Sequence, residues 1–187
     1  MKKFFLLLCI FSTTAHAAER AIDISATVKA PVADVFKAWT TTEGVTTFFS
    51  PGAVIEPRSN GLYEIQMNPL APPGERGADD MRVLGIQENK MISFTWNAPP
   101  SLPEARKQRT VVIVRFAAEG EGQTKVSLYQ VGWGEGGEWD KAYDYFSKAW
   151  PFVLGNLKKR FETGPIDWKP MLERLKTQPV APTGDRK

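Results

Sequence analysis

Residues 139–161 read WDKAYDYFSKAWPFVLGNLKKRF, and their apolar and polar side chains alternate with the period of an α-helix. The apolar positions recur at steps of three and four: Trp139, Tyr143, Phe146, Trp150, Val153, Leu154, Leu157 and Phe161. On the opposite face lie Asp140, Lys141, Asp144 and Lys148. The pattern predicts one long helix that buries an aromatic stripe, kinked at Pro151 because proline lacks the backbone N–H. The sequence Glu162-Thr163-Gly164-Pro165 predicts its end.

Seven segments that precede this helix have the composition and alternation of β-strands. They are residues 20–29, 53–57, 62–68, 80–88, 91–97, 109–118 and 124–133. Short turn sequences such as Ser59-Asn60-Gly61 separate most of them, and this close spacing favours an antiparallel sheet. Residues 69–78 and 98–107 are longer, proline-rich loops that we expect at one rim of the sheet.

Two short helices are expected directly after the first strand. Pro31 suits the first turn of a helix, and Val32, Val35, Phe36 and Trp39 follow at helical spacing. A second short helix is predicted over residues 43–49, capped by Thr42. Strand, two short helices, six strands and one long helix together predict an α+β domain. In it a curved antiparallel sheet of about seven strands wraps around the long helix.

The two ends of the chain are predicted to lie outside this domain. Residues 1–17 have the layout of a secretory signal peptide: Lys2-Lys3, the apolar run 4–11, and Ala15-His16-Ala17 as a cleavage site. The domain is then residues 18–164. Residues 165–187 form an extension, with a short helix after Asp167 and a disordered tail from 179 onward. No later stretch approaches the ~18 consecutive apolar residues of a membrane span. We therefore expect a protein that is periplasmic or secreted after cleavage near Ala17.

Removal of the signal peptide would change the chemistry available to the protein. The only cysteine and the only histidine are Cys9 and His16, so the mature chain would contain neither. This excludes disulfides, thiol nucleophiles and histidine-based catalysis, and we expect no metal and no cofactor. The net charge falls from +3 to +1, because two of the 24 basic residues are lost and all 21 acidic residues remain. Nucleic acid is therefore not implied as a partner.

The order of elements resembles the helix-grip fold of the START-like, or SRPBCC, superfamily. Within it, the chain is most similar to the branch named after the activator of the heat-shock chaperone ATPase. The similar motifs are Ala30-Pro31-Val32, Val35-Phe36-Lys37-Ala38-Trp39, Phe48-Phe49, Gly61-Leu62-Tyr63, Phe94-Thr95-Trp96, Gly132-Trp133, Asn156-Leu157-Lys158 and Glu162-Thr163-Gly164. The chain departs from the branch at Phe48, where a tryptophan is usual, and in the extension after Gly164.

The resemblance implies a deep, mostly apolar cavity between the long helix and the sheet that holds an apolar molecule. It does not carry the chaperone activity over, since an exported protein meets neither a cytosolic chaperone nor ATP. Ligand sites are largely apolar with a few polar groups. Our candidates to line the cavity are Trp39, Phe49, Tyr63, Met67, Trp96, Tyr143, Phe146 and Trp150. The alternative for each is an ordinary place in the core.

The functional hypotheses differ in the role that they give to polar residues on the strands. Glu64 and Arg82 are candidate polar anchors inside the cavity, and the alternative for both is the solvent face. Our leading hypothesis is binding of a small apolar or aromatic molecule without catalysis. A second is an enzyme of the cyclase or hydratase type, in which Glu64, Tyr63 or Arg82 polarises a substrate. A third is a co-chaperone or interaction module that uses an exposed face of the sheet.

Residues 132–137 read GWGEGG and match the glycine pattern of dinucleotide-binding loops. A dinucleotide site also needs a parallel strand after the helix, and no strand pattern follows the long helix here. Glu135 and Glu138 would in addition repel a pyrophosphate. We therefore interpret the glycines as a flexible bend between the last strand and the long helix.

Overall fold

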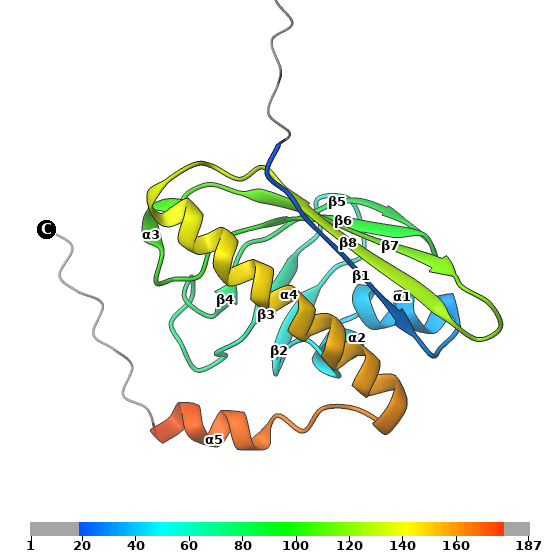
Figure 1. The fold of residues 1–187 in the computed structure, drawn as a ribbon. Coiled ribbons are helices and arrows are strands. Elements are labelled where there is room, and N and C mark those ends of the chain that lie inside the picture. Colours follow the sequence, from blue (N-terminus) through cyan, green and yellow to red (C-terminus); the bar gives the residue numbers. More distant parts are fainter. Residues whose placement is uncertain (1–18, 178–187) are drawn as a thin grey trace, which may run out of the picture.

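The computed structural model describes residues 19–177, and the predicted signal peptide and tail fall outside them. The larger of two sheets has the strand order β1-β8-β7-β6-β5, and all of its pairs are antiparallel (Figure 1). Its strands are β1 (Ile22–Val28), β5 (Val83–Gln87), β6 (Met91–Trp96), β7 (Thr110–Ala118) and β8 (Thr124–Val131).

A second, three-stranded sheet has the order β2-β3-β4. Its strands are β2 (Gly52–Ile55), β3 (Tyr63–Gln66) and β4 (Gly77–Ala78). The prediction of a single sheet of about seven strands is therefore wrong: the described residues hold five strands in one sheet and three in another. All seven predicted segments contain a strand, but β4 escaped prediction because two residues inside a proline-rich loop carry no alternation. One isolated bridge, between Leu62 and Arg82, connects the region of β3 with that of β5.

The helices of the described residues are α1 (Val32–Thr40), α2 (Thr42–Thr46), α3 (Pro103–Arg106), α4 (Gly137–Thr163) and α5 (Lys169–Thr177). Four of the helices lie where the sequence pattern indicates, with small differences at their ends, while α3 lies inside residues 98–107, which were predicted to be a loop. The cap of α2 is Thr41 and not Thr42: the Thr41 hydroxyl accepts the Gly44 N–H at 3.0 Å. Thr42 instead accepts the Ile55 N–H, so it ties α2 to β2. α4 continues as a helix through Pro151.

α4 and the large sheet enclose the main core. α4 buries Phe146, Trp150, Val153, Leu154 and Leu157 against the sheet face that carries the even-numbered residues of β1, β7 and β8. α1 closes one end of the core, where Phe36 packs edge-to-face on Phe116 of β7. At the other end, Figure 1 shows α3 beside the beginning of α4.

The glycine-rich segment forms the bend between β8 and α4. Gly132 and Gly136 have φ values of +85° and +70°, which non-glycine residues adopt only with strain. A Cβ at Gly134 would collide with the Trp139 ring, so this glycine lets the first turn of α4 fold back on the bend. α4 is followed only by α5 in the described residues, so no strand completes a dinucleotide-binding unit there.

The extension after α4 lies along the edge of the molecule near α2. The Ile166 N–H donates to the Thr47 carbonyl, and the Trp168 indole donates to the Thr46 carbonyl at 2.6 Å. α5 itself buries no residue. No helix in residues 19–177 has both the length and the hydrophobicity of a membrane span.

Candidate functional site

Four of the eight candidate aromatic and methionine positions form the centre of the core. Trp39, Phe49 and Trp150 pack ring against ring, with Phe49 5.8 Å from Trp39 and 5.7 Å from Trp150 between centroids. Tyr63 stacks on Phe94 at 3.9 Å and donates its hydroxyl to the Trp39 carbonyl at 3.1 Å. These four side chains fill the space between α4 and the sheets, where the sequence analysis placed the deep cavity.

Burial shapes the chemistry of Tyr63. The side chain is fully buried, and desolvation raises the pKa of its phenol far above the ordinary value. A phenol that stays protonated in the core serves as a hydrogen-bond donor and not as a general base. Tyr143, a fifth candidate, donates its hydroxyl to the Ala21 carbonyl at 3.0 Å and lies under the Arg20 guanidinium, so it fastens the start of β1 to α4.

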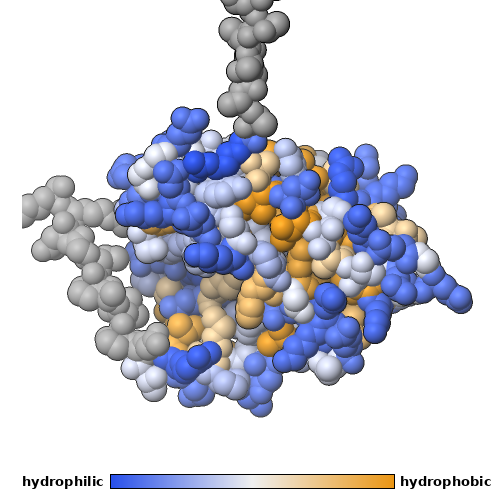
Figure 2. Space-filling view, in the orientation of Figure 1, coloured by the Kyte–Doolittle hydropathy of each residue, from blue (hydrophilic) through white to orange (hydrophobic). Residues whose placement is uncertain are grey.

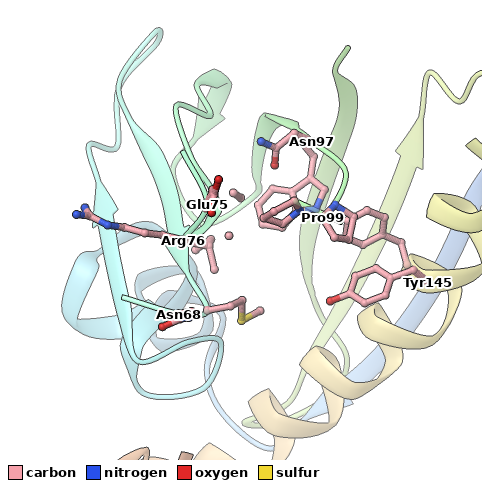
Figure 3. A pocket seen from close by; sticks show the side chains of 13 residues that line it. Asn68, Glu75, Arg76, Asn97, Pro99 and Tyr145 are labelled. Carbon is pink, nitrogen blue, oxygen red and sulfur yellow. The ribbon is translucent and has the colours of Figure 1, made fainter. Parts of the chain in front are cut away.

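The remaining three candidates, Met67, Trp96 and Phe146, come together around a cavity of about 220 Å³. It lies at one end of the core, between β3, β4, the end of β6 and α4. The other residues that line it are Ile65, Asn68, Glu75, Arg76, Gly77, Ala78, Asn97, Pro99, Pro100 and Tyr145. Figure 3 shows the Tyr145 hydroxyl directed toward the cavity from α4 and the Arg76 guanidinium directed away from it.

The small sheet makes one wall of this cavity because of the alternation along β3. Ile65 faces the interior together with Tyr63, and Met67 continues the same face at the cavity. Gly77 pairs with Gln66, and a Cβ at Gly77 would lie 2.3 Å from the Ile65 carbonyl oxygen. Only glycine therefore permits β4 to approach β3 this closely.

Both proline-rich loops border the cavity, and a half-buried ion pair joins them. The Arg106 guanidinium of the second loop lies 2.9 Å from the Asp79 carboxylate, which follows the first. It also donates to the carbonyls of Ala98 and Gly74. Desolvation lowers the pKa of Arg106, and Asp79 opposes that effect. The Glu138 carboxylate of α4 holds the second loop from the other side by accepting the N–H groups of Glu104 and Ala105.

The two candidate polar anchors lie away from the cavity. Glu64 accepts the backbone N–H of Asp80 at 2.9 Å. Arg82 forms an ion pair with Asp80 at 2.6 Å and donates to the Asn60 carbonyl. Both belong to the strand faces opposite to the core, because Tyr63 and Ile65 on β3 and Met81 and Val83 beside Arg82 take the inward positions.

The polar groups that do border the cavity were missed in the sequence analysis. Asn97 closes a predicted strand and precedes two prolines, which is a detectable sign of a chain that leaves the sheet. Tyr145 lies beside the apolar stripe of α4 and not within it, so the helical period alone assigns it to solvent. No cluster of three or more acidic, cysteine or histidine side chains suited to a metal ion occurs within residues 19–177.

Residues 29–162 match the family described as activator of Hsp90 ATPase homolog 1-like proteins. The chain belongs to this family. The resemblance seen in the sequence motifs is thereby confirmed at the level of the family and of the α+β fold with its long C-terminal helix. None of the curated proteins matches the chain.

Several solved structures have a similar fold and match most of the chain. A crystal structure of a protein from Mesorhizobium loti is 20% identical, covers 79% of this chain and 100% of its own, and has a TM-score of 0.64. The Aha1 dimer from Colwellia psychrerythraea is 18% identical over 78% of this chain and 98% of its own, with a TM-score of 0.59. An Hsp90 activator from Plasmodium falciparum is 16% identical over 78% of this chain and 97% of its own, with a TM-score of 0.57. At these identities the likeness concerns the fold alone.

Proposed function

We propose that the protein binds a small apolar or aromatic molecule in the cavity between β3, β4 and α4, without catalysis, in the periplasm. The observation that carries this proposal is the cavity itself. It is walled by Ile65, Met67, Trp96 and Phe146, and two proline-rich loops border it. Its volume of about 220 Å³ lies below the ~300–1,000 Å³ of sites for drug-sized ligands. A ligand with a single ring or a short chain fits such a space.

Catalysis of the cyclase or hydratase type receives no support from the polar residues considered for it. Tyr63 is engaged in the core, and Glu64 and Arg82 are engaged with Asp80, so none of the three borders the cavity. An enzyme of this type would need at least two of these side chains to converge at the cavity.

An interaction module on the outer face of the large sheet is also less favoured than binding. The outward positions of β7 and β8 mix apolar residues such as Ile113 and Tyr129 with Arg115 and Lys125. Figure 2, which shows one face of the molecule, has hydrophobic residues in a broken band across the middle and hydrophilic residues around it. Charged residues interrupt the outward face of β7 and β8, so this face does not form a continuous apolar docking patch.

Ligand-observed NMR with small aromatic probes, such as toluene, phenol and indole, tests the binding proposal. We expect transfer of saturation from the protein to at least one probe. Met67→Trp should abolish it, because the larger side chain fills the cavity. Leu84→Trp is the matched control, since Leu84 is an exposed residue on β5 away from the cavity. No transfer in the wild type, or equal transfer in all three proteins, would contradict the proposal.

Export is tested separately by expression of the complete chain in a Gram-negative host. We expect the protein in the periplasmic fraction, with a mature N-terminus at Ala18 by intact mass. A full-length product confined to the cytoplasm would overturn this part of the proposal and leave the binding experiment unaffected.

A further inference from the structure

One carboxylate lines the otherwise mostly apolar cavity without an ion-pair partner. Glu75 lies in the first proline-rich loop just before β4, and its side chain is partly buried and borders the cavity. Figure 3 shows Glu75 on the side of the small sheet and Tyr145 across the cavity on α4. None of the ion pairs within residues 19–177 includes Glu75. Its negative charge is therefore available to a ligand.

The loop fixes the backbone on both sides of Glu75. The Asp79 carboxylate accepts the N–H groups of Gly74 and Gly77, each at 3.0 Å. The Glu75 N–H itself donates to the Pro72 carbonyl, also at 3.0 Å. The starting point of the Glu75 side chain is thus set relative to the cavity, so little of the backbone has to be ordered when a ligand binds.

The basic residues nearby do not neutralise Glu75. Arg76 lines the cavity, but its Nε donates to the Ala71 carbonyl, and its guanidinium points away from the cavity in Figure 3. Arg106 lies outside the lining and pairs with Asp79 at 2.9 Å. Desolvation lowers the pKa of Arg106, and Asp79 opposes this effect more strongly than Glu75 does. Arg106 therefore belongs to Asp79, and no cation of the lining faces a ligand beside Glu75.

Glu75 lies where the cavity meets a second, polar space. This space has a volume of about 470 Å³, shares Glu75 in its lining and is surrounded by charged residues of the two proline-rich loops. A charged group of a ligand that pairs with Glu75 would keep contact with this polar space on one side. That position limits the cost of binding, because a charge that is fully removed from water is expensive even beside a partner.

The rest of the lining suits an apolar or aromatic group next to a positive charge. Met67, Trp96 and Phe146 form apolar walls. Tyr145 packs edge-to-face on Phe146, with 4.9 Å between the ring centroids, and directs its hydroxyl toward the cavity (Figure 3). The faces of aromatic rings carry negative potential and attract cations. The aromatic rings and the carboxylate therefore both disfavour an anion.

We propose that the cavity binds an organic cation in which a single aromatic ring or a short apolar chain carries an ammonium group. The apolar part lies among Met67, Trp96 and Phe146. The ammonium group pairs with the Glu75 carboxylate at the boundary with the polar space. This inference rests on the proposed binding function and adds the charge of the ligand.

Isothermal titration calorimetry at pH 7 with three probes of nearly equal size tests the inference on the wild-type protein. The probes are benzylamine, which is a cation at this pH, neutral benzyl alcohol and anionic benzoate. We expect benzylamine to bind at least about tenfold more tightly than benzyl alcohol, because hydrogen bonds between two charged groups are the strong ones. Benzoate should bind most weakly. The preference for benzylamine should shrink in about 0.5 M salt, which screens a partly exposed charge pair.

Variants at Glu75 assign the preference to its carboxylate. Glu75→Gln keeps the size of the side chain and removes the charge, so it should reduce the preference for benzylamine over benzyl alcohol to less than about threefold. Glu75→Lys should reverse the order, with benzoate bound more tightly than benzylamine. Glu104→Gln is the matched control, since Glu104 is exposed, pairs with Lys107 and does not line the cavity. It should retain the full preference, and thermal denaturation checks that each variant is folded.

The outcomes separate this inference from the proposed function. If benzyl alcohol binds as tightly as benzylamine, or if Glu75→Gln keeps the full preference, the inference is overturned while binding of aromatic molecules stands. If benzoate binds most tightly to the wild type, the proposed positive charge is overturned in the same way. If none of the probes binds, both the inference and the binding function are overturned.

Discussion

Gln130 of β8 is a fully buried polar residue that joins the large sheet to α4. Its side-chain oxygen accepts the Trp150 indole N–H at 2.6 Å, and its side-chain nitrogen donates to the Thr110 hydroxyl at 2.8 Å. Thr110 in turn donates to the Trp96 carbonyl. One residue therefore links β8, β7, the end of β6 and α4 through bonds that are shielded from water, which makes each of them costly to break.

Gln130→Met should lower the free energy of unfolding by about 2 kcal/mol or more, because it leaves the Trp150 N–H buried without a partner. Urea denaturation measures the change. Gln87→Met, at an exposed position of β5, is the control and should change stability by less than about 0.5 kcal/mol. The double variant Gln130→Met/Trp150→Phe should lose less free energy of unfolding than the sum of the losses in the two single variants. Full additivity would show that the bond contributes nothing.

Tyr63 should make stability depend on pH in the alkaline range. Its pKa is raised in the folded state by burial, while an unfolded tyrosine ionises near pH 10. Above about pH 10 the unfolded state therefore binds fewer protons than the folded state, so the free energy of unfolding falls as the pH rises. Below that pH the contribution is fully present. Urea denaturation between pH 8 and about 11 measures the fall, and Tyr63→Phe should weaken its slope. Tyr129→Phe, at an exposed site, should leave the slope as it is. An unchanged slope in Tyr63→Phe would show that Tyr63 is not the source of this pH dependence.

The two proline-rich loops are the elements whose structure depends most on contacts that are distant in sequence. Asp79 organises them: its carboxylate accepts the N–H groups of Gly74 and Gly77 and pairs with Arg106. Because proline has no backbone N–H, these loops form little strand pairing apart from β4, and side chains hold them in place. The cavity exists where they meet the small sheet.

Asp79→Asn should destabilise the protein by about 2 kcal/mol or more, since it removes the charge that faces the half-buried Arg106 guanidinium. The neighbouring Asp80→Asn is the matched control. Its ion pair with Arg82 is exposed, so its loss should cost less than about 1 kcal/mol. Urea denaturation compares the two variants. Hydrogen exchange should also become faster in residues 69–78 of Asp79→Asn alone; equal effects of both variants would argue against the loop connection.

At the scale of the whole molecule, the two sheets, α1 and α4 form the folded unit, and the extension is attached to its surface. The extension is tied to α2 and its C-cap Thr47 by the hydrogen bonds of Trp168 and Ile166, and α5 buries no residue. Apolar burial is the dominant source of stability, so this attachment contributes little to it.

A chain that ends at Gly164 should fold and keep the cavity, with a loss of less than about 2 kcal/mol from the missing hydrogen bonds and the Trp168 contact. Trp168→Ala in the full chain should account for much of that loss. Thermal and urea denaturation of both proteins provide the comparison. An unfolded or aggregated product from the shorter chain would show that the extension belongs to the core.

The sequence by itself determined the family and the order and type of the longer elements, because helices and strands have local periodicities that a single segment displays. It missed β4 and α3, which are too short to show a period. It also determined that residues 19–177 contain no cysteine or histidine. Only the tertiary structure decided how the strands divide into two sheets and which aromatic residues meet a cavity. Trp39 and Trp96 both end apolar patterns and both are buried in the core, yet only Trp96 also lines the cavity. The physical reason is that segments distant in sequence determine whether a side chain is packed on all sides or left beside open space. Opposite Trp96 those segments are a glycine-containing strand and loops rich in proline.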